Sequence, residues 1–172
     1  MDLKSKIRVI EDYPKEGISF KDITTLLKDK DAFKETIDEL EKAISNLDFD
    51  YIAGIESRGL IFGAPLADRL GKGFIPIRKP GKLPGAIKKV SYNLEYGSGE
   101  LEMHEDAISQ GDKVVIIDDL IATGGSAKAA GELIESLGGK VSAFEFLIEL
   151  TSLDGRSYLS DYEVISLIKY DH

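Results

Sequence analysis

Cysteine is absent from this chain of 172 residues, and histidine occurs only twice. Without cysteine the chain forms no disulfide and has no thiolate chemistry, so nothing in its composition indicates secretion. His104 and His172 are too isolated to form a metal site with the usual cysteine and histidine spacing. The composition therefore excludes disulfide scaffolds and zinc modules of that type.

Long apolar runs and positive charge are also scarce. No run reaches the length of a transmembrane helix, and the first residues, MDLKSKIRVIEDYP, contain no apolar leader segment. The 22 Lys and Arg residues are outnumbered by 31 Asp and Glu residues, and this net charge of −9 disfavours a general nucleic-acid surface. We therefore expect a cytoplasmic protein that binds neither membranes nor nucleic acids. Because basic residues gather mainly between Arg78 and Lys89, an anionic small ligand remains compatible with the acidic total.

Internal repeats, low-complexity tracts and linkers are missing too, so residues 1–172 are expected to form one domain. Apolar, β-branched runs alternate with stretches of helical periodicity, which predicts an α/β fold with a mostly parallel, twisted sheet flanked by helices. The expected strands cover residues 51–55, 73–77, 114–117, 141–150 and 164–168. The expected helices cover residues 2–10, 31–47, 59–70 and 126–138, and the expected antiparallel hairpin covers residues 90–103.

The stretch KVVIIDDLIATGGSA, residues 113–127, carries the strongest functional signal. Its apolar run ends at Asp118 and Asp119, and two glycines then lead into a helix that begins near Ser126. Such a loop points several backbone N–H groups at one place, with the positive end of the helix dipole behind them. The pattern predicts a phosphate site at the start of this helix. The alternative is a plain strand-to-helix corner with solvated acids.

The two aspartates restrict the ligand further. Ionised Asp118 and Asp119 only accept hydrogen bonds, so they repel a bare polyphosphate and suit neutral hydroxyl donors. A pentose phosphate meets both demands, because it has a phosphate at one end and vicinal hydroxyls further along. A metal ion near the acids is the other possibility, and oxygen ligands favour Mg²⁺. Neither common nucleotide loop, GxxxxGK[ST] or GxGxxG, occurs after a strand.

Several segments, in order, resemble the type I phosphoribosyltransferases and among them the family that acts on adenine. VVIIDDLIATGGSA resembles the signature that binds phosphoribosyl pyrophosphate (PRPP), and the other matching segments are FKDIT, GIESRGLIFG, IRKPGKLPG, SYNLEYG and ELTSLDGR. The resemblance covers almost the whole chain and implies the type I phosphoribosyltransferase fold, with an N-terminal hood over about residues 1–30 and a flexible lid hairpin over about residues 80–104. It implies purine salvage, in which adenine and PRPP give AMP and pyrophosphate.

The resemblance also implies where PRPP binds. The residues expected at the 5′-phosphate are Ala122, Thr123, Gly124, Gly125 and Ser126, and those expected at the ribose hydroxyls are Asp118 and Asp119. The residues expected at the pyrophosphate are Ser57, Arg58, Arg78, Lys82 and Tyr96. A cis peptide bond between Glu56 and Ser57 is expected in the same loop. Mg²⁺ is expected near the two aspartates, held mainly by PRPP and water without a direct protein ligand.

FKDIT implies the base site. Ser19, Phe20 and Lys21 are expected to contact adenine, with Leu120 packing on the opposite face of the ring. Family members often carry Arg where this chain has Lys21 and Pro where it has Thr25. The resemblance therefore assigns adenine recognition to the hood.

SYNLEYG implies the lid. Glu95 is expected to be the general acid/base for the adenine ring proton, and Tyr96 to close over PRPP. Arg58 is the second expected catalytic residue, because it stabilises the departing pyrophosphate. The loop that begins at Arg78 reaches the other subunit in this family, which implies a homodimer.

Two other functions remain open at this point. One is a phosphoribosyltransferase for another purine, xanthine or hypoxanthine and guanine, against which the FKDIT and LEYG segments argue. The other is a PRPP-sensing regulator without catalysis. A regulator of that kind needs a DNA-binding module, and this chain has neither the length nor the basic helix for one.

Overall fold

The computed structural model describes residues 1–94 and 97–172, and its centre is a five-stranded parallel sheet in the order β4-β3-β7-β8-β9. The strands are β3 (Tyr51–Ile55), β4 (Gly73–Ile77), β7 (Lys113–Ile121), β8 (Lys140–Leu150) and β9 (Val164–Tyr170). The predicted α/β fold with a mostly parallel sheet is confirmed. The strands are almost continuously apolar because helices cover the sheet on both faces.

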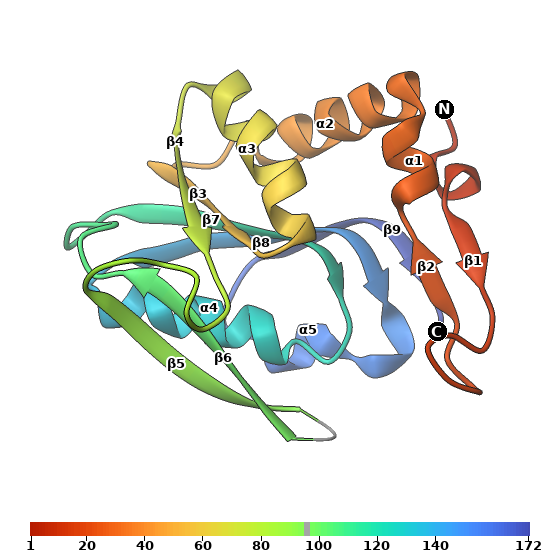
Figure 1. The fold of residues 1–172 in the computed structure, drawn as a ribbon. Helices are drawn as coiled ribbons and strands as arrows, with labels where there is room; N and C mark the ends of the chain where they lie inside the picture. The colour runs from red at the N-terminus through yellow and green to blue at the C-terminus, as the bar shows by residue number, and fades with distance from the viewer. Residues whose placement is uncertain (95–96) are drawn as a thin grey trace.

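Helices α2 (Lys30–Ile44) and α3 (Arg58–Leu70) cover one face, and α4 (Gly125–Ser136) covers the other (Figure 1). On the first face, Phe62 and Leu66 of α3 pack in one core cluster with Ile117. On the second face, Leu133 of α4 packs with Ile116. These layers fix the starts of α3 and α4 at the carboxyl edge of the sheet.

The N-terminal segment forms a small unit of its own beside the main sheet. It comprises the 3₁₀ helix η1 (Leu3–Lys6), β1 (Arg8–Ile10), β2 (Phe20–Asp22) and α1 (Thr24–Lys28). The prediction of one helix over residues 2–10 is wrong beyond residue 6, because Arg8, Val9 and Ile10 pair with β2 in an antiparallel ribbon. The apolar spacing at Leu3 and Ile7 reflects burial of both side chains, but across two different elements.

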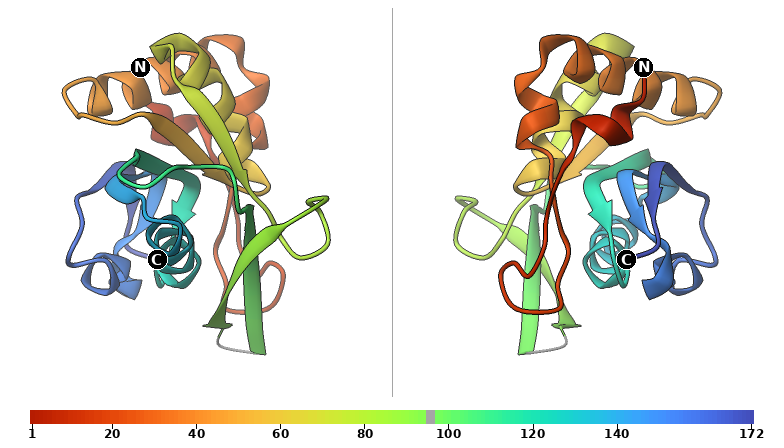
Figure 2. Two further views of the ribbon diagram at one scale, coloured as in Figure 1. Left: turned by 90° about the vertical axis from the view of Figure 1, so that its left-hand side faces the viewer. Right: turned by 90° about the vertical axis from the view of Figure 1, so that its right-hand side faces the viewer.

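A long hairpin, β5 (Ile87–Leu94) and β6 (Gly97–His104), projects from the sheet on the side of α4 (Figure 2). Leu101 and Met103 anchor its base in the core, where each is nearly fully buried. The predicted antiparallel hairpin is confirmed. Glu95 and Tyr96, two of the predicted site residues, lie outside the described residues.

The end of β7 differs from the prediction. The strand was expected to stop at Asp118, but it continues to Ile121 because it keeps pairing with β8 as far as Glu149. Asp118 and Asp119 therefore belong to the sheet itself. Beyond β8 the chain turns through η2 (Thr151–Leu153) and α5 (Gly155–Tyr158). Among the described residues, none of the helices has the length and apolar character needed to cross a membrane.

Candidate active site

The two central strands define a crevice at the carboxyl edge of the sheet. After β3 the chain turns through α3 to β4, whereas after β7 it turns through α4 to β8 on the opposite side. The loops that follow β3 and β7 therefore start from neighbouring strands and run to opposite sides. Parallel α/β sheets bind their ligands at this kind of switch point.

The loop after β7 presents the open N-terminus of α4. Gly124 precedes the helix with φ of 90°, which favours glycine, and no side chain caps the helix. The first turn contains Ser126 and no acidic residue. Its N–H groups therefore have no side-chain acceptor and suit an anion. The structure thus brings residues 122–126 together in the arrangement that the sequence predicted.

A second turn supports this loop from behind. A Cβ atom on Gly124 would lie 2.9 Å from the carbonyl oxygen of Gly155, and one on Gly155 would lie 2.6 Å from that of Ala122. Arg156 fixes the turn, since its Nε lies 3.0 Å from both carboxylate oxygens of Glu149. The sequence analysis gave the segment ELTSLDGR no role of its own. Its closeness to Ala122 and Gly124 makes it a direct support of the loop between β7 and α4.

The two aspartates differ in environment. Burial raises the pKa of the Asp118 carboxyl well above its ordinary value, and the charge of Asp119 raises it further. Asp119 is nearly buried, and its Oδ2 accepts a 2.6 Å hydrogen bond from Nε of Arg58. The pKa of Arg58 is raised by this bond and by the charge of Asp119. The site thus holds an ion pair between Arg58 and Asp119, and beside it the Asp118 carboxyl, which favours its protonated form.

The loop after β3 contains the expected cis peptide bond between Glu56 and Ser57, so that prediction is confirmed. Glu56 lies two residues before Arg58 but does not pair with it, since Arg58 binds Asp119 and Glu56 accepts a 2.9 Å bond from Nε of Arg78. Glu56 also accepts the backbone N–H of Lys79 at 2.7 Å. Burial opposes ionisation of Glu56, but these two donors lower its pKa on balance. Glu56 therefore fixes the start of the predicted pyrophosphate loop, a role that sequence reasoning missed.

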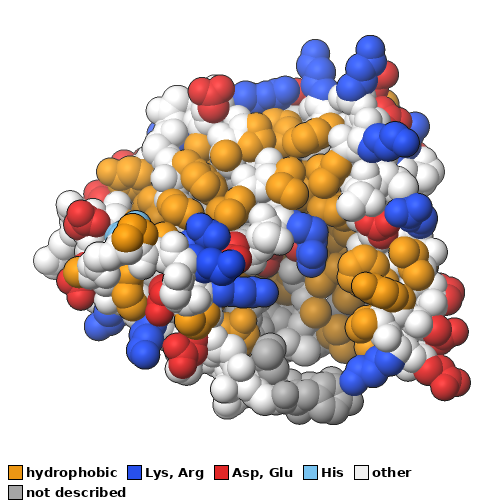
Figure 3. All heavy atoms as spheres, in the orientation of Figure 1, with side chains coloured by type: hydrophobic (Ala, Val, Ile, Leu, Met, Phe, Trp, Pro, Cys, Tyr) orange, Lys and Arg blue, Asp and Glu red, His pale blue; other side chains and the backbone are white. Residues whose placement is uncertain are grey.

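The lid hairpin holds the other side of that loop. Backbone N–H and C=O groups of Arg78 and Glu102 exchange hydrogen bonds of 2.9 and 2.7 Å, and the Glu102 carboxylate accepts the N–H of Gly81 at 3.1 Å. Lys82 lies further along the loop and is exposed. Basic side chains gather over the end of β4 and this loop, beside a hollow that separates them from the hood (Figure 3). This concentration of positive charge suits an anionic group.

The hood encloses a separate cavity of about 320 Å³. Phe20 lines it, and its ring stands edge-on to Tyr13 with centroids 5.2 Å apart. Arg58 lines the same cavity from the start of α3. Since Arg58 also binds Asp119, the cavity adjoins the aspartates.

The remaining predicted base residues occupy different positions. Lys21 is nearly buried, lines the cavity and donates to Oγ of Ser19 at 2.6 Å. Leu120 is half-buried at the end of β7 and packs on the core cluster below α3. Asp22 anchors the segment, because hydrogen bonds from Thr24 and then Arg8 lower the pKa of its carboxyl to about 2. These bonds join β2 to β1 and to the start of α1 within the hood segment.

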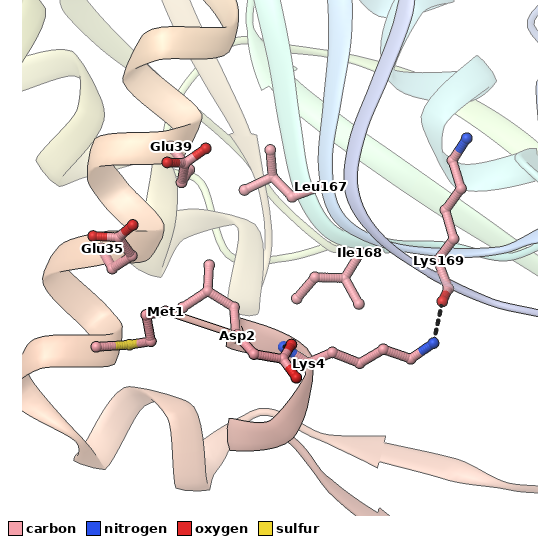
Figure 4. A pocket seen from close by; sticks show the side chains of 9 residues that line it. Met1, Asp2, Lys4, Glu35, Glu39, Leu167, Ile168 and Lys169 are labelled. Carbon is pink, nitrogen blue, oxygen red and sulfur yellow. Dashed lines mark hydrogen bonds between the residues drawn. The ribbon is translucent and has the colours of Figure 1, made fainter.

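Another cavity, of about 510 Å³, lies away from the strand ends, between the N-terminus, α2 and β9 (Figure 4). Its walls mix charged side chains such as Lys4, Glu35 and Glu39 with Leu167. None of the predicted site residues that the structure describes lines it. Within the described ranges, there is no cluster of three or more His, Cys, Asp or Glu side chains that could hold a metal ion.

Comparison with known proteins gives a consistent picture. The model of the phosphoribosyl transferase domain family matches residues 23–171. The adenine phosphoribosyltransferase of Clostridium tetani is 57% identical over 171 residues, which cover 99% of both chains, and that of Alkaliphilus metalliredigens is 57% identical over 170 residues, which cover 99% of this chain and 100% of the relative.

Solved structures agree. The adenine phosphoribosyltransferase of Thermoanaerobacter pseudethanolicus superposes with a TM-score of 0.96 at 56% identity and 98% coverage of both chains. The enzyme of Saccharomyces cerevisiae, solved with an imino-altritol bisphosphate and adenine, gives a TM-score of 0.90 at 44% identity and 96% coverage of both chains.

Proposed function

Because the chain belongs to the phosphoribosyltransferase family, and within it to the adenine phosphoribosyltransferases, we propose that the crevice at the ends of β3, β4 and β7 is its active site. The reaction is a step of purine salvage, in which the phosphoribosyl group of PRPP is transferred to adenine to give AMP and pyrophosphate. The observation that carries this assignment is the uncapped N-terminus of α4 directly beyond Asp118 and Asp119. One edge of the sheet thus offers both an anion site and hydroxyl acceptors.

The 5′-phosphate binds the backbone N–H groups of residues 122–126 and the hydroxyls of Thr123 and Ser126. Asp118 and Asp119 accept hydrogen bonds from the ribose hydroxyls. Arg58 binds Oδ2 of Asp119, and the carboxylate keeps further acceptor positions for the sugar. The Asp119 carboxylate, and Asp118 once it has lost its proton, also favour the positive charge that develops on the sugar ring as the bond to pyrophosphate breaks.

The departing pyrophosphate gains negative charge in the transition state. The residues proposed to stabilise it are Ser57, Arg58, Arg78, Lys82 and Tyr96. Arg78 is held by Glu56 at 2.9 Å, so its guanidinium is oriented before the substrate arrives. Orientation of this kind lowers the barrier because less order has to be created during the reaction.

Adenine occupies the hood cavity, where Phe20 packs on the ring and Lys21 lines the wall. Ser19, whose Oγ accepts a hydrogen bond from Lys21, is proposed to reach the edge of the ring. Leu120 packs on the opposite face. As the anomeric carbon bonds to the ring nitrogen, that nitrogen loses its proton, and Glu95 accepts it. The roles of Glu95 and Tyr96 rest on the resemblance of SYNLEYG alone.

Mg²⁺ fits this site only as a partner of PRPP. Asp118 and Asp119 offer oxygen donors, but Arg58 occupies one of them, so the side chains present do not form an all-protein cage. The ion would be held mainly by the pyrophosphate and water near these aspartates. When bound, it would neutralise charge on the leaving group.

A homodimer is the proposed assembly, in which residues 78–85 reach the partner's site. The exposed position of Lys82 supports this, since its ammonium is free to extend from the subunit. The single domain of residues 1–172, with residues 1–30 as hood and residues 80–104 as lid, remains part of the proposal. The cytoplasmic location also remains a prediction.

The deciding experiment incubates the protein with radiolabelled adenine, PRPP and Mg²⁺ and follows AMP. Hypoxanthine, guanine and xanthine are offered in parallel, with IMP, GMP and XMP as the products measured. We expect AMP formation to dominate, without any nucleic acid present. Faster formation of another nucleotide would reassign the base, and no turnover with any purine would exclude the function.

A further inference from the structure

The cavity proposed for adenine is carried by an unusually small sheet. Strands β1 and β2 contain three residues each and pair only with one another. A two-stranded ribbon of this size is marginally stable by itself. The position of Phe20 therefore depends on what ties β2 to the rest of the molecule.

Lys21 makes such a tie. The residue follows Phe20 in β2 and is only 8% exposed. Its Nζ lies 4.6 Å from the centroid of the Tyr170 ring, at the end of β9, and 2.6 Å from Oγ of Ser19. Burial lowers the pKa of Lys21, which means that its ammonium has lost part of its water shell. An aromatic face attracts a cation most strongly under these conditions.

Tyr170 is suited to this contact through its ring and not through its hydroxyl. The hydroxyl is buried and has no hydrogen-bond partner among the described residues. A second cation, Nζ of Lys4, lies 4.4 Å from the centroid of the same ring. Lys4 also donates to the carbonyl of Lys169 at 2.7 Å (Figure 4). The ring therefore joins two N-terminal elements to the last strand of the main sheet.

We propose that Lys21 is a positioning residue for adenine, whose ammonium holds β2 against the Tyr170 ring and thereby fixes Phe20 and the hood cavity. This inference rests on the proposed function, since it requires adenine to bind beside Phe20. Lys21 lines the cavity and contacts Tyr170 at once, so it links the base site to the sheet. The phosphate loop lies at the start of α4 and does not share this link.

The test is steady-state kinetics with both substrates on five variants. Tyr170→Leu removes the aromatic face and Lys21→Met removes the cation, and each is expected to raise KM for adenine about tenfold. KM for PRPP and kcat are expected to stay within about twofold, because only the base site moves. Tyr170→Phe keeps the ring, and Lys4→Met removes the cation that is not part of β2. Both should leave KM for adenine near the wild-type value.

The conservative variant Lys21→Arg provides the rescue, since it restores a cation and should return KM for adenine most of the way to the wild-type value. Unchanged KM for adenine in Lys21→Met overturns the inference even if Tyr170→Leu fails to fold. A parallel rise of both KM values, with a lower melting temperature, also overturns it in favour of a merely structural contact. Absence of AMP formation by the wild-type protein is a different result, which overturns the proposed function and this inference together.

Discussion

Nε of Arg58 lies 2.6 Å from Oδ2 of Asp119 and joins the first residue of α3 to the carboxyl end of β7. The Arg58 side chain is half exposed, whereas that of Asp119 is 9% exposed. The pair therefore stands at the boundary between the packed sheet and the crevice. It places a cation where pyrophosphate is expected and an acceptor where the ribose is expected.

Replacing Asp119 tests the sugar half of this relationship. Asp119→Asn removes the negative charge that binds Arg58 and that is proposed to bind the ribose hydroxyls. We expect KM for PRPP to rise about 10- to 100-fold, with a lower kcat. The double variant Asp118→Asn with Asp119→Asn should raise KM for PRPP further and lower kcat further. Asp161→Asn is the control, because it removes one exposed negative charge elsewhere. Equal kinetics of Asp119→Asn and this control would remove the aspartate from the PRPP site.

Glu95→Gln tests the proton transfer. The amide cannot accept the adenine ring proton, so kcat should fall about 10²- to 10⁴-fold, while KM for PRPP stays within about twofold. Glu100→Gln is the matched control on the same hairpin, where Glu100 lies 3.9 Å from Nζ of Lys89 at the surface. An unchanged kcat in Glu95→Gln would assign the proton to another group.

The contact between Gly124 and Gly155 predicts a selective effect on phosphate binding. Gly155→Ala forces a methyl group to within 2.6 Å of the carbonyl oxygen of Ala122, so the phosphate loop has to shift. We expect a stability loss of about 1–3 kcal/mol and a rise in KM for PRPP that exceeds the rise for adenine. Gly71→Ala, with φ of 65° and open space around it, serves as the control. It should lose stability without changing either KM, and a similar KM change in both variants would contradict the support role.

Glu145 predicts a pH-dependent stability. It is fully buried in β8, neither carboxylate oxygen has a hydrogen-bond partner within the described part of the chain, and burial raises its pKa from 4.5 to about 9. The folded protein therefore keeps a proton that the unfolded chain releases. The stabilising contribution of the protonated Glu145 is fully present below about pH 4.5 and is lost as the pH rises toward about 9. The loss is about 1.4 kcal/mol for each pH unit in this window.

Glu145→Met removes that titration while keeping a similar volume. Urea unfolding at pH 6 and at pH 8.5 should show the variant gaining about 3 kcal/mol on the wild type between the two pH values. Other groups titrate equally in both proteins and cancel in this difference. Parallel stability curves would mean that the Glu145 carboxylate finds a partner or water in solution.

The strands and helices of the main sheet were predictable because their apolar runs are long and local. Ile116 and Ile117 belong to an unbroken apolar run, and the strand was found from that run alone. Its true end was not predictable, because Asp118 and Asp119 read as a stop signal. Pairing with β8 overrides that local signal. The same limit applies to Arg8–Ile10, whose partner strand is separated from it along the chain.

The loop between β7 and α4 was predictable residue by residue because one short motif, residues 122–126, holds its pattern. Contacts between motifs were not predictable. Glu56 is a neighbour of Arg58 in sequence, yet it binds Arg78, which follows the next strand. Gly155 carried no visible signal either, since it comes close to Gly124 through the pairing of β7 with β8.

The neighbouring positions of β3 and β7 in the sheet make the proposed site depend on their pairing. The loop after β3 leads to Arg58 and the loop after β7 leads into α4, so each strand brings one part of the proposed PRPP site. We therefore expect a fragment that contains only one of these strands to bind no PRPP.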